Sequence, residues 1–278
     1  MARVSNSGGI TDKAQRVGRD AHQSDWFEHL IRAGLVAFGI VHLLIAWLAL
    51  QLAFGDRSEN ASSDGAIRQL ASQPFGEGLV WLIAFGMFLL VVWRLLEAAM
   101  GHQDEDGAKR TGKRIVSLGK AIVYGAIGIS AVNIALGAGS SGGTDSLTTK
   151  LMDLPAGPWI VGVVGLVIVG IGIALVVLAW TESFKEHLTA EGTSGQTGTA
   201  YVWFGKIGYC AKGIAIGIVG GLFVYAAVTH DPKKSGGLDQ ALQQVLEQPF
   251  GPFLLGVIAV GIGCYGLFCF AEAKHLSR

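Results

Sequence analysis

The chain of 278 residues balances 21 Lys and Arg against 21 Asp and Glu, and 51% of its residues are hydrophobic while 15% are charged. Soluble domains carry about 25% charged residues, so this composition excludes an ordinary water-soluble protein. The net charge of zero gives no basic surface for nucleic acid, and we expect no nucleic-acid partner.

The first part of the chain, residues 1–29, is polar and carries scattered Arg and Lys. We interpret it as a cytosolic tail, because no apolar run with a small-residue cleavage site follows at signal-peptide distance. Six apolar stretches come next, and the length of each is close to the about 20 residues that a helix needs to cross a bilayer. The sequence therefore predicts an all-α integral membrane protein whose first partner is the lipid bilayer. The stretches are Leu35–Phe54, Phe75–Trp93, Ile115–Leu136, Trp159–Trp180, Ile207–Val228 and Phe253–Ala271.

An internal repeat organises these stretches in pairs. The second, fourth and sixth follow a Pro-X-Gly sequence at Pro74, Pro155 and Pro249, and each ends near a Glu. The spacing from Pro to Glu is equal in the first and third copies and four residues longer in the middle copy. The stretches before them open with Arg or Lys at matching positions. We expect three tandem helical hairpins, residues 30–101, 113–188 and 203–274, with pseudo-threefold symmetry about the membrane normal.

The hairpin loops and the Gly-rich connections carry further signals. Each loop ends in a short amphipathic segment, with Ile67 and Leu242 on the apolar side of the first and last. These segments predict one or two helical turns lying on the membrane with the apolar side down, or alternatively a lid over a pore mouth. Gly107–Gly112 and Gly192–Gly198 are typical of flexible connectors.

The basic residues predict the orientation. Sixteen of the 21 Lys and Arg lie in the two termini, the two connections between hairpins and the adjoining helix ends, whereas five lie in the three hairpin loops. Since Lys and Arg accumulate on the cytoplasmic side, we expect both termini to face the cytoplasm.

The repeated motifs resemble a known family. Three two-helix units with Arg/Lys-x-Gly openings and Pro-Phe-Gly starts, together with the segment from Trp180 to Leu188, are similar to the bacterial membrane family called domain of unknown function 1206. The resemblance covers roughly 30–273. It implies six spans, a threefold repeat and a place in the bacterial inner membrane, and no established activity. The chain departs from the pattern at Ala156, where the motif has Phe.

A set of charged residues recurs at the predicted cytoplasmic ends. Lys120 and Lys212 occupy matching positions in their repeats, and a Glu ends each Pro-led helix. One interpretation is a charged ring at the mouth of a central pathway. We favour the other, ion pairs that tie the hairpins together at the inner leaflet. The candidate inner-face cluster is Arg94, Glu97, Lys120, Glu182, Lys212 and Glu272.

A second set of polar residues lies deeper in the spans. His42 is the deepest ionisable residue, and its repeat mates are Tyr124 and Ile216, so no ring of three His exists. We favour a neutral His hydrogen-bonded between helices over a proton relay or a metal ligand. Gln51, Asn133 and Tyr225 share one repeat position nearer the outer face. Tyr124 and Asn133 face opposite sides of one helix, which weighs against a wide aqueous pore.

Two residue types indicate packing rather than chemistry. Gly213, Gly217 and Gly221 form a small-residue ridge that predicts close packing of the fifth span. The three Cys have no metal-site or disulfide spacing, and we expect buried, inert thiols and no cofactor.

The sequence favours a structural or accessory protein of the cell envelope. The alternative is a channel or carrier for a small solute along the repeat axis. We expect no enzyme, because no nucleophile, base and orienting group share a motif. A membrane-protein partner or a second copy of the chain stays open.

Overall fold

Six long helices make up the body of the protein in a computed structural model, which describes residues 25–55, 60–100, 107–138 and 144–276. Each is long and apolar enough to span a membrane, so the expected all-α fold with six transmembrane helices is confirmed. The predicted tail 1–29 lies outside the described residues except for 25–29, which begin the first helix. The long helices are α2 (Asp25–Ala53), α4 (Gly76–Met100), α5 (Gly107–Ala135), α7 (Gly157–Thr181), α9 (Gly195–Thr229) and α11 (Gly251–Lys274).

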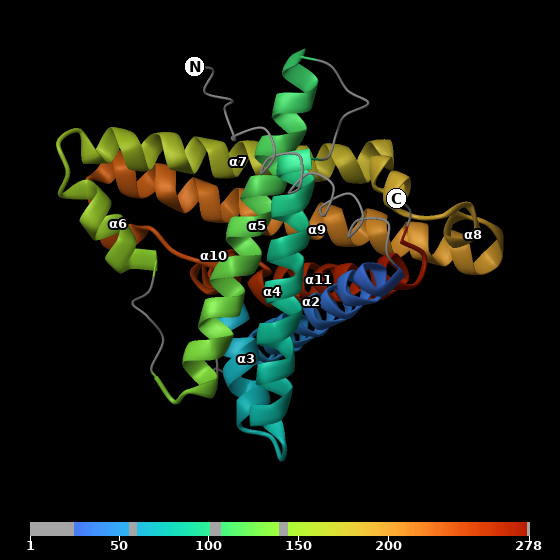
Figure 1. The fold of residues 1–278 in the computed structure, drawn as a ribbon. Helices are drawn as coiled ribbons and strands as arrows, with labels where there is room; N and C mark the ends of the chain where they lie inside the picture. The colour runs from blue at the N-terminus through green and yellow to red at the C-terminus, as the bar shows by residue number, and fades with distance from the viewer. Residues whose placement is uncertain (1–24, 56–59, 101–106, 139–143, 277–278) are drawn as a thin grey trace, which may run out of the picture.

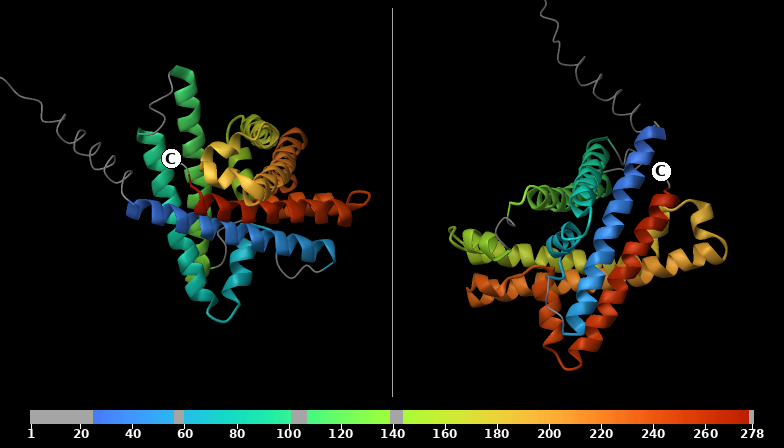
Figure 2. Two further views of the ribbon diagram at one scale, coloured as in Figure 1. Left: turned by 90° about the vertical axis from the view of Figure 1, so that its right-hand side faces the viewer. Right: turned by 90° about the horizontal axis from the view of Figure 1, so that it is seen from below.

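The long helices lie in three side-by-side pairs that run across one another (Figures 1 and 2). The closest pairs are α4 with α5, α7 with α9, and α11 with α2. Each pair joins the second helix of one sequence repeat to the first helix of the next, and α11 returns to α2. Within repeats, α2 packs on α4 and α9 on α11, whereas α5 and α7 are not a closely packed pair in the described chain. The pseudo-threefold symmetry therefore stays a prediction.

Glycines allow the close approach within these pairs. A Cβ on Gly172 of α7 would lie 2.7 Å from the carbonyl oxygen of Gly213 and 2.8 Å from the amide of Gly217, both on α9. Of the predicted ridge, only Gly213 is a position where an added Cβ would collide with α7, at 2.7 Å from the Gly172 carbonyl oxygen. A Cβ on Gly217 or Gly221 would have no heavy atom within 4 Å, whereas one on Gly220 would lie 2.6 Å from the amide of Val169. Gly213 and Gly220 are seven residues apart and share one helix face.

The Pro-X-Gly sequence forms the same turn in all three copies. The middle residue is left-handed, with φ of 64° at Phe75, 61° at Ala156 and 61° at Phe250. The Gly then begins the span. A Cβ on Gly76 would lie 2.1 Å from the carbonyl oxygen of Leu70, and one on Gly251 would lie 2.0 Å from that of Leu246. Only glycine fits where the turn folds back on the preceding short helix.

Those short helices precede each Pro-led span as predicted, but they lie against the protein. They are α3 (Ser63–Ala71), α6 (Thr144–Met152) and α10 (Leu238–Leu246). Ile67 and Leu242, expected to face the membrane, are fully buried among α2, α4, α9 and α11. The reason is that each helix is folded back onto its span by the Pro-X-Gly turn.

The remaining short helices are η1 (Ser183–His187), α8 (Ala190–Thr193) and η2 (Pro232–Lys234). The two expected connectors are also helical, since Gly107–Gly112 opens α5 and Gly192–Gly198 is divided between α8 and α9. The helical turns continue past the apolar core of the span into these Gly-rich ends.

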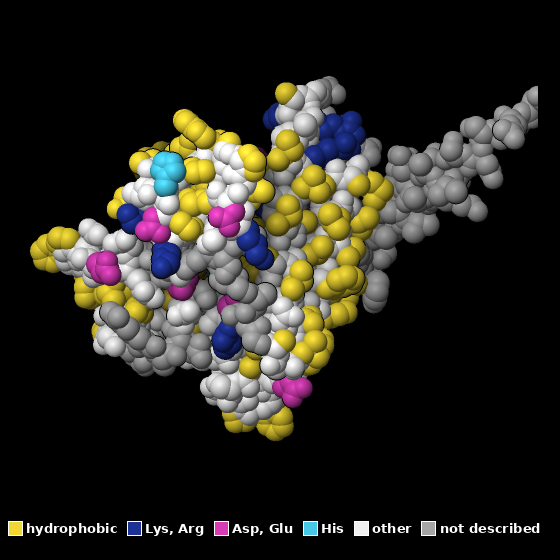
Figure 3. Space-filling model, turned by 90° about the vertical axis from the view of Figure 1, so that its left-hand side faces the viewer, with side chains coloured by type: hydrophobic (Ala, Val, Ile, Leu, Met, Phe, Trp, Pro, Cys, Tyr) yellow, Lys and Arg dark blue, Asp and Glu magenta, His cyan; other side chains and the backbone are white. Residues whose placement is uncertain are grey.

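The outward face of the bundle is apolar. Large side chains such as Phe85, Ile122 and Leu166 are exposed on α4, α5 and α7. Figure 3 shows one face, where hydrophobic side chains form a broad area with a group of Lys and Arg at its upper end. This distribution fits a surface that is covered by lipid.

Candidate functional site: a buried cluster of ionisable side chains

Ionisable side chains from five of the six spans meet inside the bundle. Lys120 of α5 interacts electrostatically with Arg94 and Glu97 of α4 and with Glu272 of α11. Lys212 of α9 interacts with Lys120 and Glu272. Arg94 and Glu272 are buried, with 4% and 5% of their surface exposed. We call this group the central cluster; its members are His42, Arg94, Glu97, Lys120, Tyr124, Lys212 and Glu272.

The α4–α5 side of the central cluster is held by short hydrogen bonds. Arg94 donates from Nη1 to Glu97 Oε2 at 2.6 Å, and the Ser117 hydroxyl donates to the same oxygen at 2.9 Å. Tyr124 lies close enough to Arg94 to interact with it. The charge of Arg94 is therefore balanced locally by Glu97.

The α2–α9 side is a contact between His42 and Lys212. Nδ1 of His42 lies 2.9 Å from the carbonyl oxygen of Phe38, which only accepts, so Nδ1 carries the hydrogen. In the neutral ring, Nε2 then holds a lone pair and accepts from the amine of Lys212 at 3.2 Å. The expectation of a neutral His bonded between helices agrees with this geometry, and its partner is a lysine.

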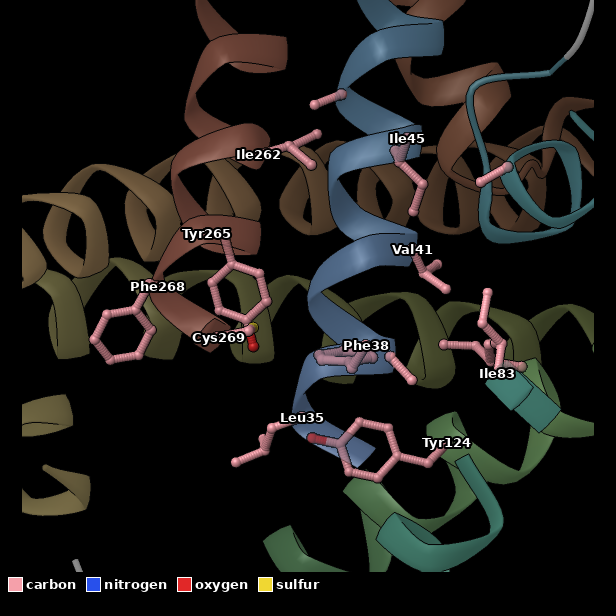
Figure 4. Close-up of a cluster of buried hydrophobic side chains, with 14 of the residues drawn as sticks. Leu35, Phe38, Val41, Ile45, Ile83, Tyr124, Ile262, Tyr265, Phe268 and Cys269 are labelled. Atoms are coloured by element: carbon pink, nitrogen blue, oxygen red, sulfur yellow. The ribbon is translucent and has the colours of Figure 1, made fainter. Parts of the chain in front are cut away.

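Aromatic rings enclose the Lys212 amine. The amine lies 3.8 Å from the ring centre of Tyr265 and 4.9 Å from that of Phe38. Figure 4 shows Phe38, Tyr124 and Tyr265 gathered from α2, α5 and α11. The faces of such rings attract a cation, which helps to hold an ammonium away from water.

Neither lysine of the central cluster has an acidic ion-pair partner. Among the described residues, no carboxylate oxygen lies within ion-pair distance of Lys120 or Lys212. The favoured interpretation, ion pairs that tie the hairpins together, is therefore wrong for these two lysines. Once Arg94 and Glu97 balance each other, two lysines face one carboxylate, Glu272. With His42 neutral and both lysines protonated, the cluster would carry one excess positive charge.

Glu182 was predicted to join this group and lies elsewhere. It follows α7 and accepts hydrogen bonds from Lys185 and, at 3.2 Å, from Lys206. These two hydrogen bonds hold the pKa of Glu182 below its usual value. The four extra residues between Pro155 and Glu182 explain the displacement, because they place Glu182 just past the end of α7 at Thr181, whereas Glu97 and Glu272 lie inside α4 and α11.

The outer polar set does not converge in the described chain. Gln51 accepts from Gln69 of α3 at 3.4 Å, and Tyr225 is 53% exposed, with the Lys234 amine 4.8 Å from its ring centre. Asn133 is partly buried on α5. Gln51 and Tyr225 therefore make separate local contacts, although the three positions match in sequence.

Four further residues of the site were missed. Tyr265 and Cys269 lie seven and three residues before Glu272, Tyr209 lies three before Lys212, and Ser117 lies three before Lys120. Residues three, four or seven apart share a helix face, so this spacing could have identified them. Tyr209 and Tyr265 are buried and pack edge to face at 5.1 Å. Cys269 is a buried free thiol.

The chemistry available here is binding of an anion and exchange of a proton. A lysine ammonium group can attract a small anion, and the Lys212 amine donates a hydrogen bond to Nε2 of His42. In the described residues no three His, Cys, Asp or Glu side chains gather as a metal site would require.

Comparison with known proteins supports the repeat. The family described as Domain of Unknown Function (DUF1206) matches residues 33–101, 115–182 and 207–275. A protein of Bacillus subtilis (strain 168), named "Uncharacterized protein YxxB", is 28% identical over 253 residues, which cover 90% of this chain and 91% of that protein. No solved structure matches.

Proposed function

The chain belongs to the DUF1206 family of multi-pass membrane proteins, and from its central cluster we propose that it is a carrier for a small anion, with binding linked to a proton. The family resemblance assigns no activity, so the proposal depends on the geometry of the cluster alone. It reverses the order favoured by the sequence, where a structural role came first.

The observation that carries the proposal is the amine of Lys212. It lies in the middle of α9 with a neutral imidazole and two aromatic rings around it and without an acidic ion-pair partner among the described residues. A charged side chain in the middle of a membrane span is expensive to bury, and such residues commonly mark ion or substrate pathways. A purely structural bundle has no use for an excess buried cation, whereas an anion-binding site needs one.

The proton link follows from His42. Its Nε2 accepts from Lys212, and its Nδ1 donates to a backbone carbonyl. If an anion draws the Lys212 amine away, Nε2 becomes free to take a proton. The other charged groups that face Lys212 are Lys120 and Glu272. The anion and the proton would then bind together, as in a proton-coupled carrier.

A structural role stays the second candidate, because glycine contacts pack α7 on α9 and α2 on α11 at close range. We also propose that the protein is not an enzyme, that it resides in the bacterial inner membrane, and that both termini face the cytoplasm. The asymmetry of Lys and Arg supports the orientation.

The test is flux in liposomes that contain the purified full chain. We expect a pH gradient to drive uptake of at least one of chloride, inorganic phosphate, acetate and lactate above the level of empty vesicles. Lys212→Met should abolish the uptake, whereas Lys109→Met, which removes an exposed charge at the start of α5, should retain it.

Lys212→Arg guards against misfolding as the explanation, since it keeps the charge and should keep part of the uptake. Flux equal to empty vesicles for all four anions contradicts the carrier. So does uptake that survives Lys212→Met. Either result returns the structural role to first place.

A further inference from the structure

Two adjoining hollows lie beside the end of α7 and the first half of α9. The first is an apolar groove of about 320 Å³ between α7, α9 and α11, with Val176, Ile214 and Val257 among its walls. The second is a polar hollow of about 250 Å³. Trp203 and Lys206 line both. The other walls of the polar hollow are Glu182, Lys185, Thr193, Thr199 and Val202.

The groove has the length of one membrane leaflet. It follows α9 from Trp203 to Ile214, which at about 1.5 Å per residue is about 16 Å. The apolar core of a bilayer is about 30 Å thick, so the groove spans roughly half of it. Its exposed walls, such as Ile207 and Val257, are hydrocarbon. A single acyl chain matches both the length and the lining.

The polar hollow carries excess positive charge. The amines of Lys185 and Lys206 both donate to the carboxylate of Glu182. Two ammonium groups thus share one carboxylate, and all three side chains are partly exposed. A phosphate in the hollow would balance the remaining charge.

Aromatic residues mark the level of the headgroups. The Lys206 amine lies 5.8 Å from the ring centres of both Trp180 and Trp203, and these rings are 81% and 57% exposed. Trp is enriched where the headgroups meet the acyl chains. Lys206 therefore lies at the boundary between the polar hollow, which can hold a phosphate, and the apolar groove, which can hold an acyl chain.

We propose that the two hollows bind one anionic phospholipid, with its phosphate at Lys185 and Lys206 and one acyl chain along α9. The hollows share α9 and α11 with the central cluster, but no member of the cluster lines either hollow. The lipid site is therefore separate from the anion site of the carrier proposal and does not depend on it. Basic pockets between spans are the usual places for anionic headgroups.

The test is native mass spectrometry of the purified full chain with phosphatidylglycerol and phosphatidylcholine of identical acyl chains. We expect phosphatidylglycerol to bind more tightly. A lysine near an anionic headgroup contributes about 1 kcal/mol, so Lys206→Gln should weaken phosphatidylglycerol binding about fivefold. Lys109→Gln, which removes a charge on α5 away from the groove, should leave it unchanged.

A second pair of variants tests the groove. Ile214→Trp fills its deep end and should reduce the binding of both lipids, while Leu166→Trp, on the exposed face of α7 outside the groove, should not. Thermal unfolding in phosphatidylcholine alone checks that each variant is folded.

The proposal is overturned by equal binding of the two lipids, by equal effects of the Lys206 and Lys109 variants, or by no difference between the two tryptophan variants. Soluble glycerol phosphate that competes as well as the intact lipid would also overturn it, because the hollow would then be a site for a free anion.

Discussion

The amine of Lys212 on α9 contacts Nε2 of His42 on α2 at 3.2 Å, although 170 residues separate the two in sequence. The contact joins the first span to the fifth through the interior. Nδ1 of His42 donates a hydrogen bond to the carbonyl oxygen of Phe38, and this bond fixes the orientation of the imidazole ring. Nε2 is therefore the ring nitrogen that can accept from Lys212. This relationship leads to the first prediction.

Replacing His42 by Phe should destabilise the protein by about 1–3 kcal/mol, since the Lys212 amine loses its hydrogen-bond acceptor inside the bundle. Adding Lys212→Met should recover most of the loss, because no buried charge is then left alone. Thermal unfolding of the two single variants and the double variant in one detergent forms the double-mutant cycle. Additive losses would show that the two residues do not interact.

The Pro-X-Gly turn gives a second prediction. Gly76→Ala or Gly251→Ala places a Cβ about 2 Å from a backbone carbonyl oxygen, and forced packing of this kind costs about 1–3 kcal/mol. Gly78→Ala is the matched control, because a Cβ there has no heavy atom within 4 Å. Its unfolding temperature should stay equal or rise. Equal behaviour at positions 76 and 78 would contradict the turn geometry.

The third prediction concerns pH and Glu182. Its two lysine partners lower its pKa in the folded protein below the ordinary value of 4.5. The contribution of Glu182 to stability is therefore complete above about pH 4.5 and is lost as the pH falls through the lower folded pKa. The unfolding temperature of the wild type minus that of Glu182→Gln should be constant above this pH and shrink below it. A difference that grows on acidification contradicts the assignment.

A fourth prediction tests the orientation. In a background without Cys210, Cys264 and Cys269, a Lys233→Cys variant should react with an impermeant thiol reagent on intact cells. A Glu191→Cys variant should react only after the membrane is opened. Both positions are exposed. Lys233 lies between α9 and α11, and Glu191 lies between α7 and α9. The reverse pattern would place both termini outside.

The spans and the repeat could be predicted because both depend on local sequence. A run of about 20 apolar residues suffices for a span, and the Pro-X-Gly turn recurs with matching glycines. The site could also be predicted in part, since matching repeat positions placed Lys120 and Lys212 at one depth in the membrane. Five of the six inner-face candidates do meet. Glu182 was placed wrongly because the four extra residues of the middle repeat carry it past the end of α7.

The partners of each helix could not be predicted in this way. A repeat shows which segments are alike, not which ones touch, so the pairing of α4 with α5 and of α11 with α2 is absent from the pattern. Tyr265 was missed for a related reason. Its link to the site is its position seven residues before Glu272 on the same helix, and a comparison of repeat positions does not reveal that.

The contact between α2 and α11 has a consequence for biosynthesis. The ribosome makes α2 well before α11, so α2 enters the bilayer before its main partner exists. Gly39 and Gly266, which let these two helices approach, can meet only after α11 has entered the bilayer. Insertion and assembly are therefore separate stages for this chain. Until α9 has entered the bilayer, His42 lacks Lys212, and until α11 has entered, α2 lacks its main packing partner.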